Sequence, residues 1–392
     1  MNDYLLITLL IISFAVIIWM VASRKEFGLA IIIGALLMAI SIPEKIPDIL
    51  LKTATDYKVI SLIAIVVMIK MLAVILQETG LLQGVIDVMQ EKLSYKGMLI
   101  AIPSILGLLP VPGGALLSAP LIDVHGKVAN VKKDLLMAIN LWYRHIWFII
   151  FPLATPLVLL ADFSGENIFK IIGMQIPMFL LAFFTGYFFV RKVGNVDKRR
   201  KEKEGDLKGL LPILIPVSIA MPLSFFISTY SSFLISLPIG IFVAWLISEK
   251  KSIEIIKKGF SVSLAVAIFG IMFLKNIIFA SGIPDVISSH LIHLPVVFTI
   301  ATLSFIIGLL TAHNLAAIGI LYPILSPFLD SIGLINLLYI SSFMGYLISP
   351  IHPCVVLTYD YFRPKFIDAY KLLIPPSIAI VIIAGIFYGI MI

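Results

Sequence analysis

The sequence has few cysteines and few charged residues, and each shortage excludes a class of protein. One of its 392 residues is cysteine, 13% are charged and 60% are hydrophobic. The lone Cys354 excludes disulfide frameworks and cysteine-based zinc or iron–sulfur sites within one chain. So little charge excludes a soluble chain of this length. Apolar runs reach the roughly 20 residues that a helix needs to cross a bilayer, so we predict an all-α polytopic membrane protein rather than a β-barrel.

Basic residues are also missing from one long stretch, between Asn276 and Phe362. Elsewhere they alternate with the apolar runs, as expected for cytoplasmic loops, and their pattern does not indicate a nucleic-acid partner. Of the 29 basic residues, 21 fall in six segments predicted to be cytoplasmic and four in segments predicted to be external. The charges therefore predict a multi-pass protein of the cytoplasmic (inner) cell membrane, with both termini outside.

The apolar runs divide the chain into two halves, residues 1–190 and 209–392, joined by a charged cytoplasmic linker at 191–208. Each half is predicted to contain five transmembrane helices and one re-entrant hairpin, at about 98–125 and 294–326. An odd number of crossings inverts the second half relative to the first, which is a signature of secondary transporters. The predicted spans are 4–22, 28–42, 58–78, 134–160 and 168–190, then 209–228, 233–248, 259–280, 334–361 and 367–391; residues 81–93 form an interfacial helix, and 43–57 and 281–293 are connections.

Each hairpin has a tip that an unbroken helix would not tolerate. The first tip contains Pro110, Pro112, Gly113 and Gly114, which lack either a backbone donor or a side chain to hold helical dihedrals. Irregular backbone at membrane depth is tolerated where protein or a water-filled cavity satisfies it, so we expect this tip to contact substrate through backbone groups. The motif GLLP at 107–110 recurs as GLLT at 308–311.

The second tip carries polar side chains, namely Thr311, His313 and Asn314. They are either caps of a kinked helix or binding groups, and we predict that they bind substrate because polar groups in an apolar hairpin are costly unless used. Thr311 and Asn314 are also candidate ligands for a sodium ion.

Two predicted spans carry polar groups near their midpoints: the first has Arg144 and His145, and the second has Ser349 and His352 between prolines. Pro152 and Pro156 could break the first span, and Pro350 and Pro353 predict local unwinding of the second. A centred arginine costs roughly 2.5–3.5 kcal/mol on insertion scales, so it needs a partner. The sequence suggests that His352 occupies a place comparable to that of His145.

The predicted membrane core contains cations but no buried carboxylate. Arg144, Lys70 and Lys275 lie within spans, whereas the nearest acidic residues, Glu78, Asp162 and Asp360, lie towards span ends. An anionic substrate would balance this charge. The imbalance also argues against a sodium/proton antiporter built on a membrane-buried carboxylate.

Three motifs resemble an uncharacterised integral-membrane family, domain of unknown function 401, within the ion-transporter superfamily. They are PVPGGALLSAPLID at 110–123, NLWYRHIWFIIFPL at 140–153 and SPIHPCVVLTYDYF at 349–362. The resemblance runs along nearly the whole chain. The superfamily includes gluconate, citrate, dicarboxylate and arsenite transporters, which implies inverted repeats, re-entrant hairpins and often an elevator-like homodimer. The Ser-Asn-Thr hairpin motifs of its sodium/dicarboxylate members are not reproduced here, which favours proton coupling through histidine.

These features predict a secondary active transporter for a small organic anion, most simply a carboxylate, coupled to H⁺ or Na⁺. It would lie in the lipid bilayer as a homodimer, with no chemical step, no cofactor and no metal. The predicted substrate-binding residues are Pro110, Pro112, Gly113, Gly114, Arg144, His145, Thr311, His313, Asn314, Ser349 and His352. The alternative is a membrane-embedded enzyme in which His145, His313 and His352 bind a metal ion, although no acidic ligand or general base accompanies them.

Overall fold

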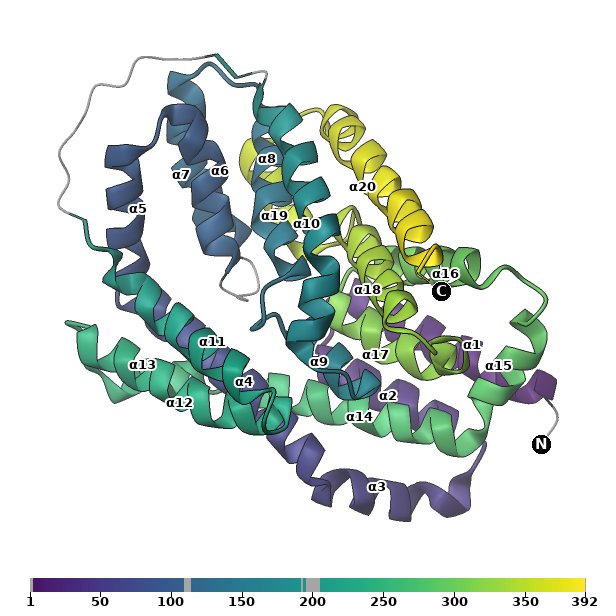
Figure 1. The fold of residues 1–392 in the computed structure, drawn as a ribbon. Coiled ribbons are helices and arrows are strands. Elements are labelled where there is room, and N and C mark those ends of the chain that lie inside the picture. Colours follow the sequence, from purple (N-terminus) through teal and green to yellow (C-terminus); the bar gives the residue numbers. More distant parts are fainter. Residues whose placement is uncertain (1–2, 109–113, 192, 195–204, 392) are drawn as a thin grey trace.

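A computed structural model describes residues 3–108, 114–191, 193–194 and 205–391, which form helices and no strands (Figure 1). The predicted all-helical class is confirmed. Several helices in this part of the chain are long and apolar enough to cross a membrane, which confirms a membrane protein at the level of length and composition. They are Asp3–Ala22, Tyr57–Glu78, Ile168–Arg191, Thr229–Ile247, Ile253–Ser281 and Phe366–Gly389.

Within the described residues, ten α-helices precede residue 192 and ten follow residue 204. The first series is α1 (Asp3–Ala22), α2 (Phe27–Ala39), η1 (Pro43–Lys45), α3 (Ile46–Thr55), α4 (Tyr57–Glu78), α5 (Leu81–Lys92), α6 (Tyr95–Gly107), α7 (Ala115–Val128), α8 (Lys133–His145), η2 (Ile146–Ile149), α9 (Thr155–Ser164) and α10 (Ile168–Arg191). The second series is η3 (Leu207–Leu210), α11 (Leu211–Leu223), α12 (Thr229–Ile247), α13 (Ile253–Gly259), α14 (Val262–Ser281), α15 (Ile283–Leu291), α16 (Val296–Thr311), α17 (Asn314–Leu325), η4 (Ser326–Phe328), α18 (Ile332–Leu347), α19 (Pro353–Phe362) and α20 (Phe366–Gly389).

Three short helices differ from the sequence prediction. Helices α3 and α15 occupy segments that we expected to be connections, and α13 precedes a predicted span. The prolines that indicated loops, Pro47 and Pro284, lie in the first turns of α3 and α15. Proline is well tolerated there because its fixed φ suits a helix and its missing N–H would have no partner. Each proline therefore begins a helix.

The helices pack as two groups. The frame group consists of α1, α2, α4 and α11–α14, in which α2 packs on α14 and α4 packs on α12. The hairpin group consists of α6–α10 and α16–α20, in which α6 packs on α7 and α8, and α16 packs on α17 and α18. Figure 1 shows α8, α10, α18 and α20 running together beside the layer that contains α11, α12 and α14. The groups meet where α14 contacts α17 and where α4 contacts α9.

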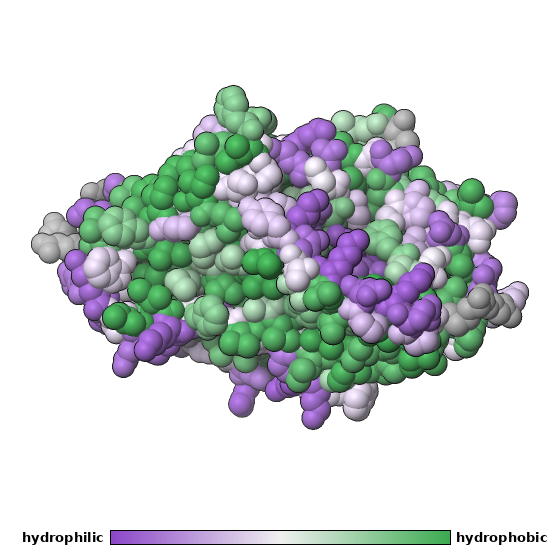
Figure 2. All heavy atoms as spheres, turned by 90° about the horizontal axis from the view of Figure 1, so that it is seen from below, coloured by the Kyte–Doolittle hydropathy of each residue, from purple (hydrophilic) through white to green (hydrophobic). Residues whose placement is uncertain are grey.

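Large apolar side chains cover much of the outer surface. Phe226 is 85% exposed, Phe225 67% and Phe298 65%. Figure 2 shows extensive apolar surface on the face seen from below, interrupted by hydrophilic side chains. Soluble monomers rarely expose contiguous apolar patches of more than a few hundred Å², whereas a bilayer covers such a surface without cost.

Candidate functional site

The first hairpin meets α8 at a point of very close backbone approach. Gly107, the last residue of α6, faces the backbone of Arg144, and a Cβ built there would lie 2.1 Å from the Arg144 carbonyl oxygen. The second hairpin repeats this arrangement, since a Cβ at Gly308 would lie 2.0 Å from the carbonyl oxygen of Ser342 in α18. Only glycine allows backbones to approach so closely, which explains the recurring GLL motif.

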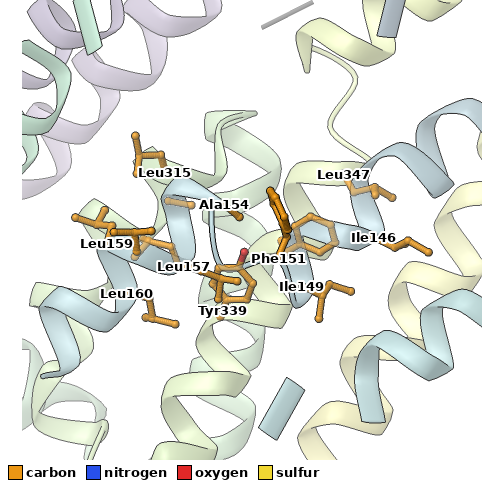
Figure 3. Close-up of a cluster of buried hydrophobic side chains, with 14 of the residues drawn as sticks. Ile146, Ile149, Phe151, Ala154, Leu157, Leu159, Leu160, Leu315, Tyr339 and Leu347 are labelled. Atoms are coloured by element: carbon orange, nitrogen blue, oxygen red, sulfur yellow. The ribbon is translucent and has the colours of Figure 1, made fainter. Parts of the chain in front are cut away.

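The long span predicted at 134–160 is interrupted in its middle. Helix α8 ends at His145, the chain continues through η2 and a turn, and α9 begins at Thr155 with Pro156 in its first turn. Tyr339 of α18 donates a hydrogen bond of 2.7 Å from its hydroxyl to the carbonyl of Phe148. Figure 3 shows Tyr339 among the buried side chains around this interruption, including Phe151 and Leu157. The irregular backbone is therefore held by protein, as irregular backbone at membrane depth must be.

The span predicted at 334–361 is also broken. Helix α18 ends at Leu347, and α19 begins at Pro353 with His352 as its N-cap residue. Ser349 is fully buried in the turn between them, and its hydroxyl has no hydrogen-bond partner within the described structure. The prolines that predicted local unwinding thus lie at the break itself.

The second hairpin tip is a tight turn between α16 and α17. Ala312 ends α16 in the left-handed region, with φ of 51°. The Thr311 hydroxyl donates to the carbonyl of Ile307 at 2.8 Å. The backbone N–H of Ala316 donates to Nδ1 of His313 at 3.4 Å, and the His313 ring stacks on Phe27 of α2 with centroids 4.3 Å apart. Thr311 and His313 therefore each have a structural role at this tip.

The breaks and the second tip surround one cavity of about 180 Å³. Its volume is below the roughly 300–1,000 Å³ of pockets for drug-sized ligands, so it suits a small solute. Among the described residues that line it there is no aspartate or glutamate. They are Val66, Ile69, Lys70, Arg144, His145, Phe148, Thr155, Pro156, Leu264, Ala312, His313, Asn314, Leu315, Tyr346, His352, Pro353 and Cys354.

Arg144 is 2% exposed and already has a protein partner. One guanidinium nitrogen donates to the carbonyl of Leu106 at 2.8 Å, in the last turn of α6, where carbonyls lack partners within the helix. The guanidinium also lies beside the Cys354 side chain. An arginine has five N–H donors, so this bond anchors the side chain and leaves donors for a ligand.

Three helix N-termini reach the cavity. Residues of the first turns of α9, α17 and α19 line it, and neither α9 nor α19 has a side-chain cap. Backbone N–H groups and the helix dipole make such ends favourable for anions. Asn314 in the first turn of α17 is 4% exposed, and its Nδ2 has no hydrogen-bond partner in the described structure. The cavity therefore offers positive potential and an unused donor.

Five predicted site residues line this cavity: Arg144, His145, His313, Asn314 and His352. Thr311 and Ser349 occupy the adjoining turns and are not among the lining residues. Gly114 is the N-cap residue of α7 and also does not line the cavity. The remaining predicted residues, Pro110, Pro112 and Gly113, lie outside the described residues.

Two sequence interpretations need correction. His145 ends α8, whereas His352 is the N-cap of α19, so the two do not occupy comparable places; their rings contact across the break, with centroids 4.9 Å apart. In addition, the carboxylate of Asp162 is buried, with its side chain 2% exposed. It lies 3.9 Å from the ammonium of Lys275, on α14. Sequence position placed Asp162 near a span end, but packing against α14 buries it.

The predicted site residues did not include Cys354 or Lys70, both of which line the cavity. The break before Pro353 was a usable signal for Cys354, because the residues after a break form the first turn of a half-helix, where backbone N–H groups lack partners within the helix. Nothing local in sequence distinguishes Lys70 from a lysine that reaches the membrane surface.

A family model matches residues 6–391 of the chain, nearly its whole length. Its description is "protein of unknown function (DUF401)". The chain belongs to the DUF401 family. No curated protein matches it. Membership of DUF401 thus agrees with the resemblance carried by the three motifs, two of which, at 140–153 and 349–362, contain the broken helices that form the cavity.

Proposed function

We propose that this DUF401 protein is a secondary active transporter of a small organic anion, most simply a carboxylate. The observation that carries the proposal is the convergence of three helix N-termini with Arg144 and Lys70 on one small cavity whose described lining has no carboxylate. Each helix end favours an adjacent anion by about 0.3–1 kcal/mol, or up to about 2 kcal/mol when partly buried. The Leu106 carbonyl holds Arg144 in place while its remaining donors bind the anion.

The proposed architecture is a pair of inverted repeats, residues 1–190 and 209–392, each with five crossings and one re-entrant hairpin. Recurrence of the helix order supports it, as do contacts that exchange equivalent partners: α2 packs on α14 and α4 on α12, while α7 packs on α19 and α9 on α17. Each proposed hairpin is a pair of helices in contact with each other, α6 with α7 and α16 with α17.

Alternating access would follow from movement of the hairpin group against the frame group, an elevator-like motion. The cavity lies at the junction of the two groups. Its lining residues from the frame group are Val66, Ile69, Lys70 and Leu264, and all of its other lining residues come from the hairpin group. In the proposed membrane orientation both termini are external, and the protein forms a homodimer.

The proposed coupling ion is H⁺, with Na⁺ as the alternative. Three histidines line the cavity, and any of them could carry a proton. The Thr311 hydroxyl, a candidate sodium ligand, is committed as a donor to the Ile307 carbonyl.

A thermal-shift experiment on purified protein tests the proposal. Acetate, succinate and citrate would be compared with the neutral acetamide and succinamide, at two pH values and with and without sodium. A ligand at 100 times its Kd stabilises the folded state by about 2.7 kcal/mol. At least one carboxylate should raise the melting temperature of the wild type but not of Arg144→Gln, and its amide should have no effect. Uptake of that carboxylate into proteoliposomes should then require an ion gradient. Equal stabilisation by the carboxylate and its amide would contradict an anion site.

A further inference from the structure

Three potential metal ligands meet at the two helix breaks. His145 ends α8, while His352 and Cys354 begin α19. One potential ligand atom from each residue lies within 4.8 Å of the other two, and all three residues are buried. This set differs from the three histidines predicted from sequence, because Cys354 takes the place of His313. A single cysteine excludes zinc sites built on several cysteines, but it does not exclude a mixed site that combines one thiolate with two histidines.

The His145 ring is already oriented as in metal-binding histidines. Its Nδ1 lies 2.7 Å from the carbonyl oxygen of Leu141, one turn earlier in α8. A carbonyl only accepts hydrogen bonds, so Nδ1 must carry the proton and Nε2 keeps a lone pair. Histidines that bind metals almost always donate their other ring N–H in this way, which fixes both the tautomer and the ring orientation.

His352 has an unused ring nitrogen. The residue is 2% exposed, and its Nδ1 has no hydrogen-bond partner in the described structure. The ring lies between His145 and Tyr346, with centroid distances of 4.9 and 4.2 Å, so its position is set by packing. A buried polar atom without a partner is costly, which favours a ligand at this point.

We propose that His145, His352 and Cys354 bind a transition-metal ion of the zinc or copper(I) class. Two imidazoles and a thiolate are the ligands that such ions prefer, whereas magnesium and calcium require oxygen ligands that the described cavity lining does not supply as carboxylates. Bonds of about 2.0–2.3 Å in tetrahedral geometry need ligand atoms roughly 3.3–3.8 Å apart. The three atoms all lie within 4.8 Å of one another, so binding an ion requires them to approach by about 1 Å.

The surroundings indicate what completes the coordination. All three residues line the cavity, so an ion held by them is reachable from it, as in sites that keep an exchangeable position. Arg144 lies beside Cys354, and its positive charge favours an anion over neutral water as the fourth ligand. This site does not depend on the proposed transport activity, because a metal ion can bind whether or not the cavity transports an anion.

Cobalt(II) titration of the full-length purified protein tests the site, since Co²⁺ replaces Zn²⁺ and reports a thiolate ligand by charge-transfer absorption. We expect one Co²⁺ per chain with that absorption, displaced by Zn²⁺. Cys354→Ser should abolish the charge-transfer band, because this is the only cysteine. His352→Ala should weaken binding by more than about tenfold, since even the loss of an outer-shell partner typically costs 10- to 100-fold.

Two matched variants separate this site from other histidine sites. His290→Gln, at an exposed position on α15, and His313→Gln, at the second hairpin tip, should both keep Co²⁺ binding and the band. Absence of the band from folded wild-type protein would overturn the proposal without any variant. Loss of binding in His313→Gln with retention in Cys354→Ser would also overturn it, in favour of the three-histidine set. Neither result would alter the carboxylate thermal shift that tests transport.

Discussion

In both halves of the molecule a hairpin glycine packs against the backbone of a helix, a few residues before that helix is interrupted. The residue that the glycine contacts differs between the halves. Gly107 meets Arg144, whereas Gly308 meets Ser342. The first half therefore contributes a buried cation at this position, and the second contributes a hydroxyl. Ser342 in turn donates to Oδ1 of Asn314 at 3.3 Å, which orients the amide at the second tip. Similar backbone packing thus supports an asymmetric site, with charge from one half and neutral hydrogen-bonding groups from the other.

The half-helices after the breaks show a second difference. Asp162 in α9 and Asp360 in α19 hold the same position in their ten-residue helices. Asp162 is buried and pairs with Lys275, while Asp360 is exposed. Lys275 in α14 and Lys70 in α4 also hold the same position in their helices, yet Lys70 lines the cavity. Equivalent sequence positions therefore have different roles: Asp162 and Lys275 form an ion pair between the halves, whereas Lys70 lines the candidate site.

The largest effect should follow from an alanine at either glycine. Gly107→Ala and Gly308→Ala each place a Cβ near 2 Å from a backbone oxygen that cannot rotate away. Overpacking typically costs about 1–3 kcal/mol and more where backbone must shift, so both should melt far below the wild type or fail to fold. Gly173→Ala in α10, where a Cβ meets nothing within 4 Å, is the control and should not be destabilising. Tolerance at one glycine only would show that the halves are not packed alike.

Arg144 and Ser342 should differ in their effect on anion binding. Arg144→Lys keeps the charge but loses the planar fork, and Arg144→Gln loses both. We expect Arg144→Gln to weaken binding of a stabilising carboxylate by about 10- to 100-fold, from the 1.5–3 kcal/mol of a hydrogen bond to a charged group, with Arg144→Lys intermediate. Ser342→Ala should weaken it by only a few fold. Titration calorimetry measures both effects. If Arg144→Gln binds the carboxylate normally but melts at a lower temperature than the wild type, Arg144 serves only as a cap of α6.

Asp162→Asn should destabilise the protein more than Asp360→Asn. Asp162→Asn leaves the partly buried ammonium of Lys275 unpaired, which should lower the free energy of unfolding by about 1–3 kcal/mol. Breaking a fully buried pair would lower it by about 3–5 kcal/mol. Asp360→Asn alters an exposed side chain and should change the free energy of unfolding by less than about 0.5 kcal/mol. Lys275→Met added to Asp162→Asn should recover part of the loss. Thermal melting of the three variants and the wild type is the measurement, and equal effects of the two aspartate changes would mean that the pair adds nothing.

The smallest effect concerns the left-handed Ala312 between α16 and α17. Its φ of 51° costs roughly 1 kcal/mol in a residue with a Cβ, and glycine avoids that cost. Ala312→Gly should therefore raise the melting temperature slightly, and Ala312→Val should lower it. A lower melting temperature for Ala312→Gly would show that the Ala312 methyl group contributes more by packing than its backbone loses by strain.

The membrane class, the long apolar helices, the turn at the second hairpin tip and the interruptions of the two broken spans were predictable from the sequence. They depend on local properties: apolar runs of sufficient length, and prolines and glycines that remove hydrogen bonds or permit sharp turns. The same proline rule failed for α3 and α15, because a proline in the first turn of a helix and one in a loop look alike in sequence.

The sequence by itself thus determined which segments are apolar and long enough to enter a membrane and where helices break, since hydropathy and backbone geometry act over a few residues. Only the tertiary structure decided that Arg144 uses the carbonyl of Leu106, that Asp162 is buried against Lys275, and that Cys354 joins His145 and His352. Such pairings depend on how each helix is rotated against its neighbour. That rotation is set by close contacts such as those at Gly107 and Gly308, between residues far apart in the chain.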